Sequence, residues 1–199
     1  MNSEPEPEHA SYPGQLQPNV LVHPTADRRL AVEHWLLSTT PFTDRARREW
    51  RESGVAMLPL GGLMSAVRIP GKLLTALTQT TATLQDVDAF LAATLDGPVI
   101  CDPRAPWYYA LVPGRVPSTW SRAVAEWREA DVVCLGRDSY LAVPKVDAVP
   151  DPTVRDPHWS VPMESAGVLC EPLVVARLIA AARHAMTEPD VDPVPEVGR

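Results

Sequence analysis

The sequence predicts an α+β fold, with a largely antiparallel sheet of short hairpins flanked by helices. Short apolar runs bounded by turn residues are typical of strands and hairpins. Segments with helical periodicity do not alternate strictly with these runs, as they would in a parallel βαβ fold. The 22 prolines and 10 glycines among 199 residues also predict short elements separated by many turns.

Composition indicates one globular domain, expected over 26–186. The chain is 45% apolar and 22% charged, which is ordinary for a globular protein. Residues 1–25 and 187–199 are acidic and rich in proline, so we expect a disordered arm and a disordered tail. No apolar run is long enough to span a membrane and no signal peptide is visible, so we expect a cytoplasmic protein.

Most of the net charge of −7 lies in the two acidic ends. Residues 26–186 hold 17 basic and 18 acidic side chains, so the expected domain is nearly neutral. Dedicated nucleic-acid binders usually carry a basic excess, which argues against that class but leaves room for a local basic patch.

Helical periodicity predicts two helices at the start of the domain, 27–37 and 43–53. In the second, Thr43 is the expected N-cap and Gly54 the expected stop. The first places five side chains near one face, which we expect to point inward: Leu30, Ala31, His34, Trp35 and Leu37. Four further helices are expected at 72–78, 86–95, 120–130 and 172–186. The last of them is apolar on nearly all sides and should be well buried.

Turn residues between apolar runs predict three hairpins. They join 55–60 to 63–69 around Gly61-Gly62, 98–101 to 107–112 around 102–106, and 131–135 to 139–143 around 136–138. Residues 158–162 form a last short strand. The middle hairpin carries the densest aromatic cluster, Trp107-Tyr108-Tyr109, and the other elements are expected to be arranged around it.

Cys101, Cys134 and Cys170 each end an apolar run and form no CxxC or Cys-His zinc pattern. We therefore expect buried free thiols in a reducing compartment.

The spacing Asp86-Val87-Asp88 is that of a metal-binding D-x-D pair on a strand, but here it begins a predicted helix. Residues two positions apart on a helix point in nearly opposite directions, so these carboxylates cannot converge on one ion. We expect them to cap the helix instead.

Loop cations, one turn carboxylate and two aromatics are the candidate ligand-binding residues. Asp102 ends a strand in a proline-flanked turn, where it serves either the turn or a ligand. The cations either gather into an anion site or are scattered over the surface. Trp107 and Tyr109 share one face of their strand and could stack on a base, whereas Tyr108 points to the other face. The full candidate set is Arg68, Lys72, Asp102, Arg104, Trp107, Tyr109, Arg115 and Arg137.

A string of short motifs over about residues 50–182 resembles a known family. The motifs are GVAMLPL with AVRIP, GPVICDP, YYALVPG, CLGRDSYLAVP and HWSVPM. They resemble actinobacterial proteins assigned to the N-terminal domain of bifunctional DNA primase/polymerases, the prim-pol group. Active members of that family use a strand-borne D-x-D pair, a further Asp and a His to bind two metals and a nucleotide. Here the strand ending VICDP has the single carboxylate Asp102, so the resemblance implies a prim-pol-like scaffold without the catalytic motif.

Two functions follow as hypotheses. The first is a catalytically degenerate prim-pol-like domain that binds nucleotide or single-stranded DNA in a replication-related or regulatory role. It predicts that Arg68, Arg104 and Arg137 converge beside Trp107 or Tyr109. The second is a non-enzymatic module that binds a protein partner. No cofactor is predicted, and Mg²⁺ is expected only if the domain retains activity.

Overall fold

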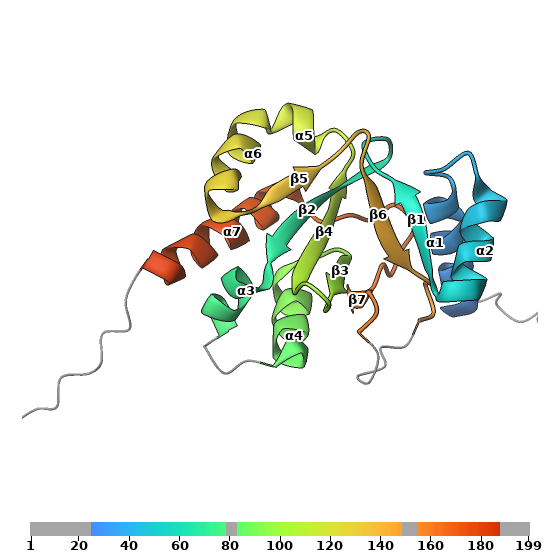
Figure 1. Ribbon diagram of the computed structural model, residues 1–199, viewed down its shortest axis with the longest axis horizontal. Coiled ribbons are helices and arrows are strands. Elements are labelled where there is room, and N and C mark those ends of the chain that lie inside the picture. Colours follow the sequence, from blue (N-terminus) through green and yellow to red (C-terminus); the bar gives the residue numbers. More distant parts are fainter. Residues whose placement is uncertain (1–24, 79–82, 149–154, 188–199) are drawn as a thin grey trace, which may run out of the picture.

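The computed structural model describes residues 25–78, 83–148 and 155–187 and shows an α+β architecture (Figure 1). Its main sheet has five strands in the order β5-β2-β4-β3-β7, and every neighbouring pair is antiparallel. The α+β prediction with a largely antiparallel sheet is therefore confirmed. The strands are β2 (Met64–Pro70), β3 (Val99–Asp102), β4 (Trp107–Pro113), β5 (Val133–Leu135) and β7 (His158–Val161).

The remaining two strands, β1 (Val55–Pro59) and β6 (Tyr140–Pro144), form a separate antiparallel sheet. Two of the three predicted hairpins are therefore wrong. Strand β1 pairs with β6 rather than β2, and β5 pairs with β2 rather than β6. The reason is that both connecting turns carry the chain from one sheet to the other. Gly61 adopts a positive φ of 87°, and its backbone N–H donates to the carbonyl of Met64 at 2.7 Å.

The central hairpin is confirmed, and it fixes the two faces of the main sheet. Strand β4 pairs with β3 on one side and with β2 on the other. Tyr108 is 1% exposed and belongs to the core on the helix-covered face. Tyr109 and Trp107 point to the opposite face and are half-buried, as their alternation predicts.

Helices α3 (Gly71–Thr78), α4 (Leu84–Thr94) and α7 (Pro172–Thr187) pack on the Tyr108 face of the sheet. Helices α5 (Val116–Thr119) and α6 (Ser121–Trp127) and a 3₁₀ turn (Arg128–Ala130) lead into β5. Helix α7 buries only one stripe, Val175, Leu178, Ile179 and Ala182, while Leu173 is 42% exposed. The prediction of burial on nearly all sides is thus wrong for this helix, because it packs at the surface of the layer.

Helices α1 (Thr25–Leu37) and α2 (Thr43–Ser53) lie outside β1, on the opposite side of the molecule from α3 and α7 (Figure 1). The predicted inward face of α1 is only partly right. Leu37 is buried and Trp35 is half-buried against the inter-sheet core, but Leu30, Ala31 and His34 are exposed, and the other buried residues are Val32 and Leu36.

Helix α2 ends at Gly54, in the left-handed conformation, as predicted. Thr43 is not its N-cap: Phe42 occupies that position, and no side chain caps the helix. Glu49 pairs with Arg45 at 2.7 Å and also accepts the backbone N–H of Met57 at 2.9 Å. It thereby satisfies a donor on the outer edge of β1.

All three cysteines are free; Cys101 and Cys170 are buried, and Cys134 is half-buried. The predicted arm and tail lie outside the described residues, except that Thr25 and Thr187 belong to α1 and α7. Residues 79–82 and 149–154 lie outside them as well. Within the described ranges, no helix combines the length and apolar character needed to cross a membrane.

Candidate functional site

A groove of about 330 Å³ lies between the main sheet and β6. Its sheet wall comes from three neighbouring strands and consists of Arg68, Ile100, Asp102 and Tyr109. Its other wall is Met57, Tyr140, Leu141 and Ala142 from the small sheet, with Leu135 and Pro157 completing the lining. Three predicted candidates therefore share one concave surface, on the Trp107–Tyr109 face of the main sheet.

Arg68 occupies an unusual place for a cation, inside the central strand β2. Its backbone lies directly opposite Tyr109 of β4 and Val133 of β5. The side chain reaches along β4, so that its guanidinium carbon is 4.3 Å from the centre of the Trp107 ring. Its Nε is buried and has no hydrogen-bond partner among the described residues. Arg68 therefore reaches the groove with one aromatic contact and an unused donor.

Asp102 is the carboxylate of the groove. It ends β3 directly opposite Trp107, and its Oδ1 accepts the backbone N–H of Arg104 at 3.1 Å. This contact is the turn role that its position before Pro103 predicts. The Arg104 guanidinium pairs instead with Asp156, at the surface. The Asp102 side chain thus both shapes the turn and lines the groove.

Tyr109 lies between the two charges. Burial raises the pKa of its hydroxyl, the nearby Asp102 carboxylate raises the pKa further, and Arg68 opposes both effects. The hydroxyl therefore stays protonated near neutral pH. Beside the Arg68 cation and the Asp102 carboxylate, the groove thus offers a neutral hydroxyl that both donates and accepts hydrogen bonds.

The remaining cations do not join this group. Lys72, in α3, pairs with Asp131 at 2.8 Å, and both side chains are exposed. Arg115 follows the end of β4, where the backbone of Gly62 lies close to Gly114. Arg137 follows the end of β5, where its own backbone lies close to Gly61. That end of β4 is about 20 Å from Trp107, given the rise of a strand. The expected convergence of Arg68, Arg104 and Arg137 is therefore wrong: of the three, only Arg68 contacts Trp107, while Arg104 pairs with Asp156.

The groove does not fit the two metal ions that the prim-pol resemblance would imply. Two-metal sites hold their ions with several carboxylates, and the groove lining contains Asp102 alone, facing the cation Arg68. No group of three or more His, Cys, Asp or Glu in the described part of the chain is arranged to hold a metal ion.

A polar cluster that the sequence did not predict lies on the helix-covered face. Asp88, on α4, accepts the hydroxyl of Ser160, and its Oδ2 is 3.6 Å from Nε2 of His158 on β7. Asp86 caps α4 as predicted, through a capping box with Thr83, but Asp88 joins α4 to β7 instead of capping. The D-x-D motif alone could not predict that Asp86 caps the helix while Asp88 bonds to β7, because β7 is far away in the sequence.

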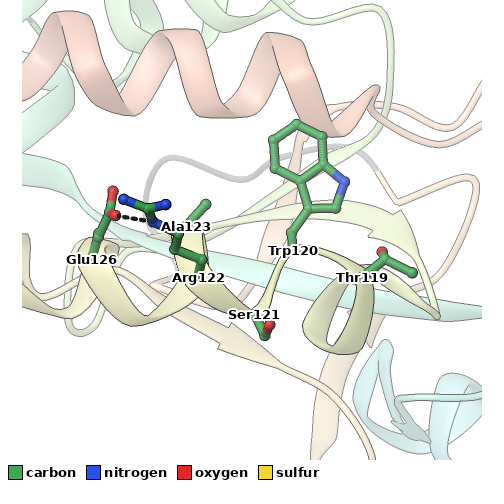
Figure 2. Close-up of a pocket in the computed structure, with 6 residues that line it drawn as sticks. All are labelled: Thr119, Trp120, Ser121, Arg122, Ala123 and Glu126. Carbon is green, nitrogen blue, oxygen red and sulfur yellow. Dashed lines mark hydrogen bonds and ion pairs between the residues drawn. The ribbon is translucent and has the colours of Figure 1, made fainter.

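Another hollow runs along α5 and α6 (Figure 2). Figure 2 shows the Trp120 ring directed toward α7, while Arg122 and Glu126 form a pair on α6. That pair is exposed and one helical turn apart, as on any solvated helix face. The hollow brings no charged groups from different elements together, so the inter-sheet groove is the stronger candidate site.

No known protein family, curated protein or solved structure matches the chain.

Proposed function

We propose that the groove between the two sheets binds a nucleotide, either free or at the end of a single strand of DNA. We propose further that the domain is a catalytically degenerate prim-pol-like module with a replication-related or regulatory role. The sequence motifs and the lone carboxylate Asp102 support the second proposal. One observation carries the first: Arg68 lines the groove from inside a sheet with its guanidinium held on the Trp107 ring and paired with no carboxylate among the described residues.

Arg68 is half-buried, and the part of its guanidinium that lines the groove is what a ligand can reach, because the Nε itself is buried. A phosphate suits this planar cation especially well. The Trp107 ring holds the guanidinium in place from one side, so little side-chain freedom is lost on binding. Arg68 is thus prepared for an anion.

The other groove residues favour a planar ligand of limited size. Tyr109 and the exposed Tyr140 bring rings to the two walls, and Ile100 and Leu141 add apolar surface to the same two walls. Aromatic rings stack on bases of any sequence. A volume of about 330 Å³ lies at the lower end of ligand pockets, which suits one nucleotide rather than a long strand.

The charges near the groove also predict that the backbone of a longer DNA strand is bound only weakly. Lys72 and Arg104 are each paired with an aspartate, so Arg68 is the unpaired cation of the groove lining in the described chain. One phosphate contact gives a salt dependence of only about −0.7 in log K against log salt.

Calorimetric titration of nucleoside monophosphates, with and without a short oligonucleotide attached, tests the proposal. Arg68→Met keeps the apolar stem and removes the charge, and should weaken binding by about 10- to 150-fold, the worth of a charged hydrogen bond. Arg137→Met, at the other end of the sheet, is the matched control and should bind like the unmodified protein. If attaching the oligonucleotide leaves the affinity unchanged, the mononucleotide alone is sufficient for binding. Absence of binding at millimolar ligand, or equal losses in both variants, would overturn the proposal.

A second candidate, binding of an extended peptide, is favoured by the free edge of β6. Because Met57 N–H points outward to Glu49, its cross-strand neighbour Ala142 turns its own N–H and C=O away from β1. No described strand pairs with that edge. Ala142→Pro would remove this N–H without breaking the β1–β6 ladder. Peptides selected from a random library for binding to the unmodified protein should then bind this variant more weakly. Peptides that bind the variant equally well would exclude the β6 edge as the peptide-binding site.

A further inference from the structure

Asp102 has acceptor capacity that the fold does not use. Its one hydrogen bond within the described residues is the turn contact from the backbone of Arg104, at 3.1 Å. The nearest arginine of the turn, Arg104, is engaged with Asp156. A carboxylate has about four acceptor positions and no donor when ionised, so several of them remain open toward the groove.

Two fixed groups on opposite sides of β4 give the groove a direction. Asp102, on β3, lies opposite Trp107 of β4, and Arg68, on β2, stacks on the same Trp107 ring. Tyr109 lies between these two charges, and both of them shift the pKa of its hydroxyl. A ligand with a negative end and a hydrogen-donating end would be bound with the first at Arg68 and the second at Asp102, since the reverse placement sets like charges together.

The bases differ in what they present to a carboxylate. Guanine offers two adjacent donors, N1–H and the 2-amino group, which match the two oxygens of a carboxylate. Adenine and cytosine each place a single amino group beside a ring nitrogen whose lone pair a carboxylate repels. In uracil and thymine the one N–H lies between two carbonyl oxygens. Only guanine therefore avoids an unfavourable contact at Asp102 while forming two hydrogen bonds.

We infer that the groove selects guanine nucleotides, with Asp102 reading the N1–H and 2-amino edge and Arg68 holding the phosphate. This selectivity rests on the nucleotide binding proposed above. Asp102 is thus the specificity-determining residue, and its bond from Arg104 holds the carboxylate in place.

The test is calorimetric titration of the four ribonucleoside 5′-monophosphates and of inosine 5′-monophosphate, which lacks the 2-amino group. The protein should prefer GMP over AMP, CMP and UMP by about 5- to 150-fold, the discrimination of a bidentate base contact. Inosine monophosphate should fall between GMP and AMP, because it keeps N1–H alone.

Asp102→Asn keeps the shape and the turn acceptor, but replaces one acceptor oxygen by a donor. It should reduce the preference for GMP to within about threefold, since the pair of acceptors is gone. Asp44→Asn is the matched control, because Asp44 is an exposed aspartate on α2 outside the groove lining, and it should keep the preference. Thermal unfolding of each variant confirms that the fold is retained.

The outcomes separate the two proposals. If no monophosphate binds the unmodified protein, nucleotide binding itself fails. If the monophosphates bind through Arg68 with equal affinity, or Asp102→Asn leaves the GMP preference intact, guanine selection fails while nucleotide binding stands.

Discussion

The guanidinium carbon of Arg68 lies 4.3 Å from the centre of the Trp107 ring, on the neighbouring strand. In register Arg68 stands opposite Tyr109 and Trp107 opposite Pro70, so the contact runs diagonally across β2 and β4. It fixes the cation of the groove on an aromatic support rather than on a carboxylate. The positive charge therefore stays available to a ligand.

Arg68→Lys tests whether the planar group matters or only the charge. Lysine lacks the flat guanidinium and the Nε donor, so we expect nucleotide affinity to fall by at least about tenfold. The lost stacking should lower the free energy of unfolding by about 0.5–1 kcal/mol. Calorimetry and urea denaturation measure the two effects, with Arg137→Lys as control. Affinity unchanged in Arg68→Lys would mean that a point charge suffices.

The crossing between the two sheets depends on Gly61. Its φ of 87° disfavours any side chain, and an added Cβ would stand 2.3 Å from the backbone nitrogen of Arg137. Gly61→Ala should therefore lower the free energy of unfolding by more than about 2 kcal/mol. Gly62→Ala is the control, since no atom lies within 4 Å of its added Cβ, and it should change stability by less than about 1 kcal/mol. Equal effects in urea denaturation would refute this role of Gly61.

The positions of the strands were predictable, but most of their partners were not. Apolar runs and turn residues mark strands locally, and Val55–Pro59 and Met64–Pro70 appear close to where the pattern places them. Which strands pair depends instead on how each strand is buried by residues far away in the sequence. Met64 to Val67 are all buried on both faces, which fits a central strand between β4 and β5 better than a hairpin with β1.

The same limit applies to the site and to α1. Arg68, Asp102 and Tyr109 were predictable as candidates from local pattern, but Met57 and Tyr140 enter the groove only because β1 pairs with β6. In α1, two overlapping sets of apolar residues both have helical spacing. Which set is buried depends on where the small sheet packs, and no local signal distinguishes them.

Tyr108 carries a buried hydroxyl with one weak partner. The residue is 1% exposed, and the Cys101 thiol is the weak hydrogen-bonding group that faces its Oη. Burial, with the adjacent Cys101 and Asp88, raises the pKa of Tyr108 strongly, so the hydroxyl stays neutral. Tyr108→Phe should change the melting temperature by no more than a few degrees, because a thiol is a weak partner for the hydroxyl that is removed. Calorimetric unfolding measures this, and a larger fall would show that the bond to Cys101 stabilises the fold.

Tyr109→Phe is the comparison on the groove face of the same strand. It should leave stability nearly unchanged and weaken nucleotide binding, because its hydroxyl lies between Arg68 and Asp102. The two variants thus separate a core role from a ligand role.

The His158–Asp88 pair should make stability depend on pH. The hydrogen bond to Asp88 raises the pKa of His158, against the effect of burial. An unfolded histidine titrates near pH 6.5. A raised folded pKa means that the pair stabilises the protein fully below about pH 6.5, and that this contribution is lost as pH rises through the folded pKa. A hydrogen bond to the backbone of Asp156 also raises the pKa of His158. Its register partner Cys101, whose pKa is raised to about 12 by burial, stays neutral throughout.

Urea denaturation of the unmodified protein and His158→Gln, at a series of values from about pH 5.5 to about pH 8.5, measures this contribution. The stability difference between them should be largest at the acidic end and shrink above about pH 6.5. Asp88→Asn should greatly reduce the pH dependence of that difference, because the neutral amide no longer favours the charged imidazole, although the backbone contact to Asp156 remains. A difference that is constant across the range would show that His158 acts by packing alone, and one that grows with pH would reverse the sign of the interaction.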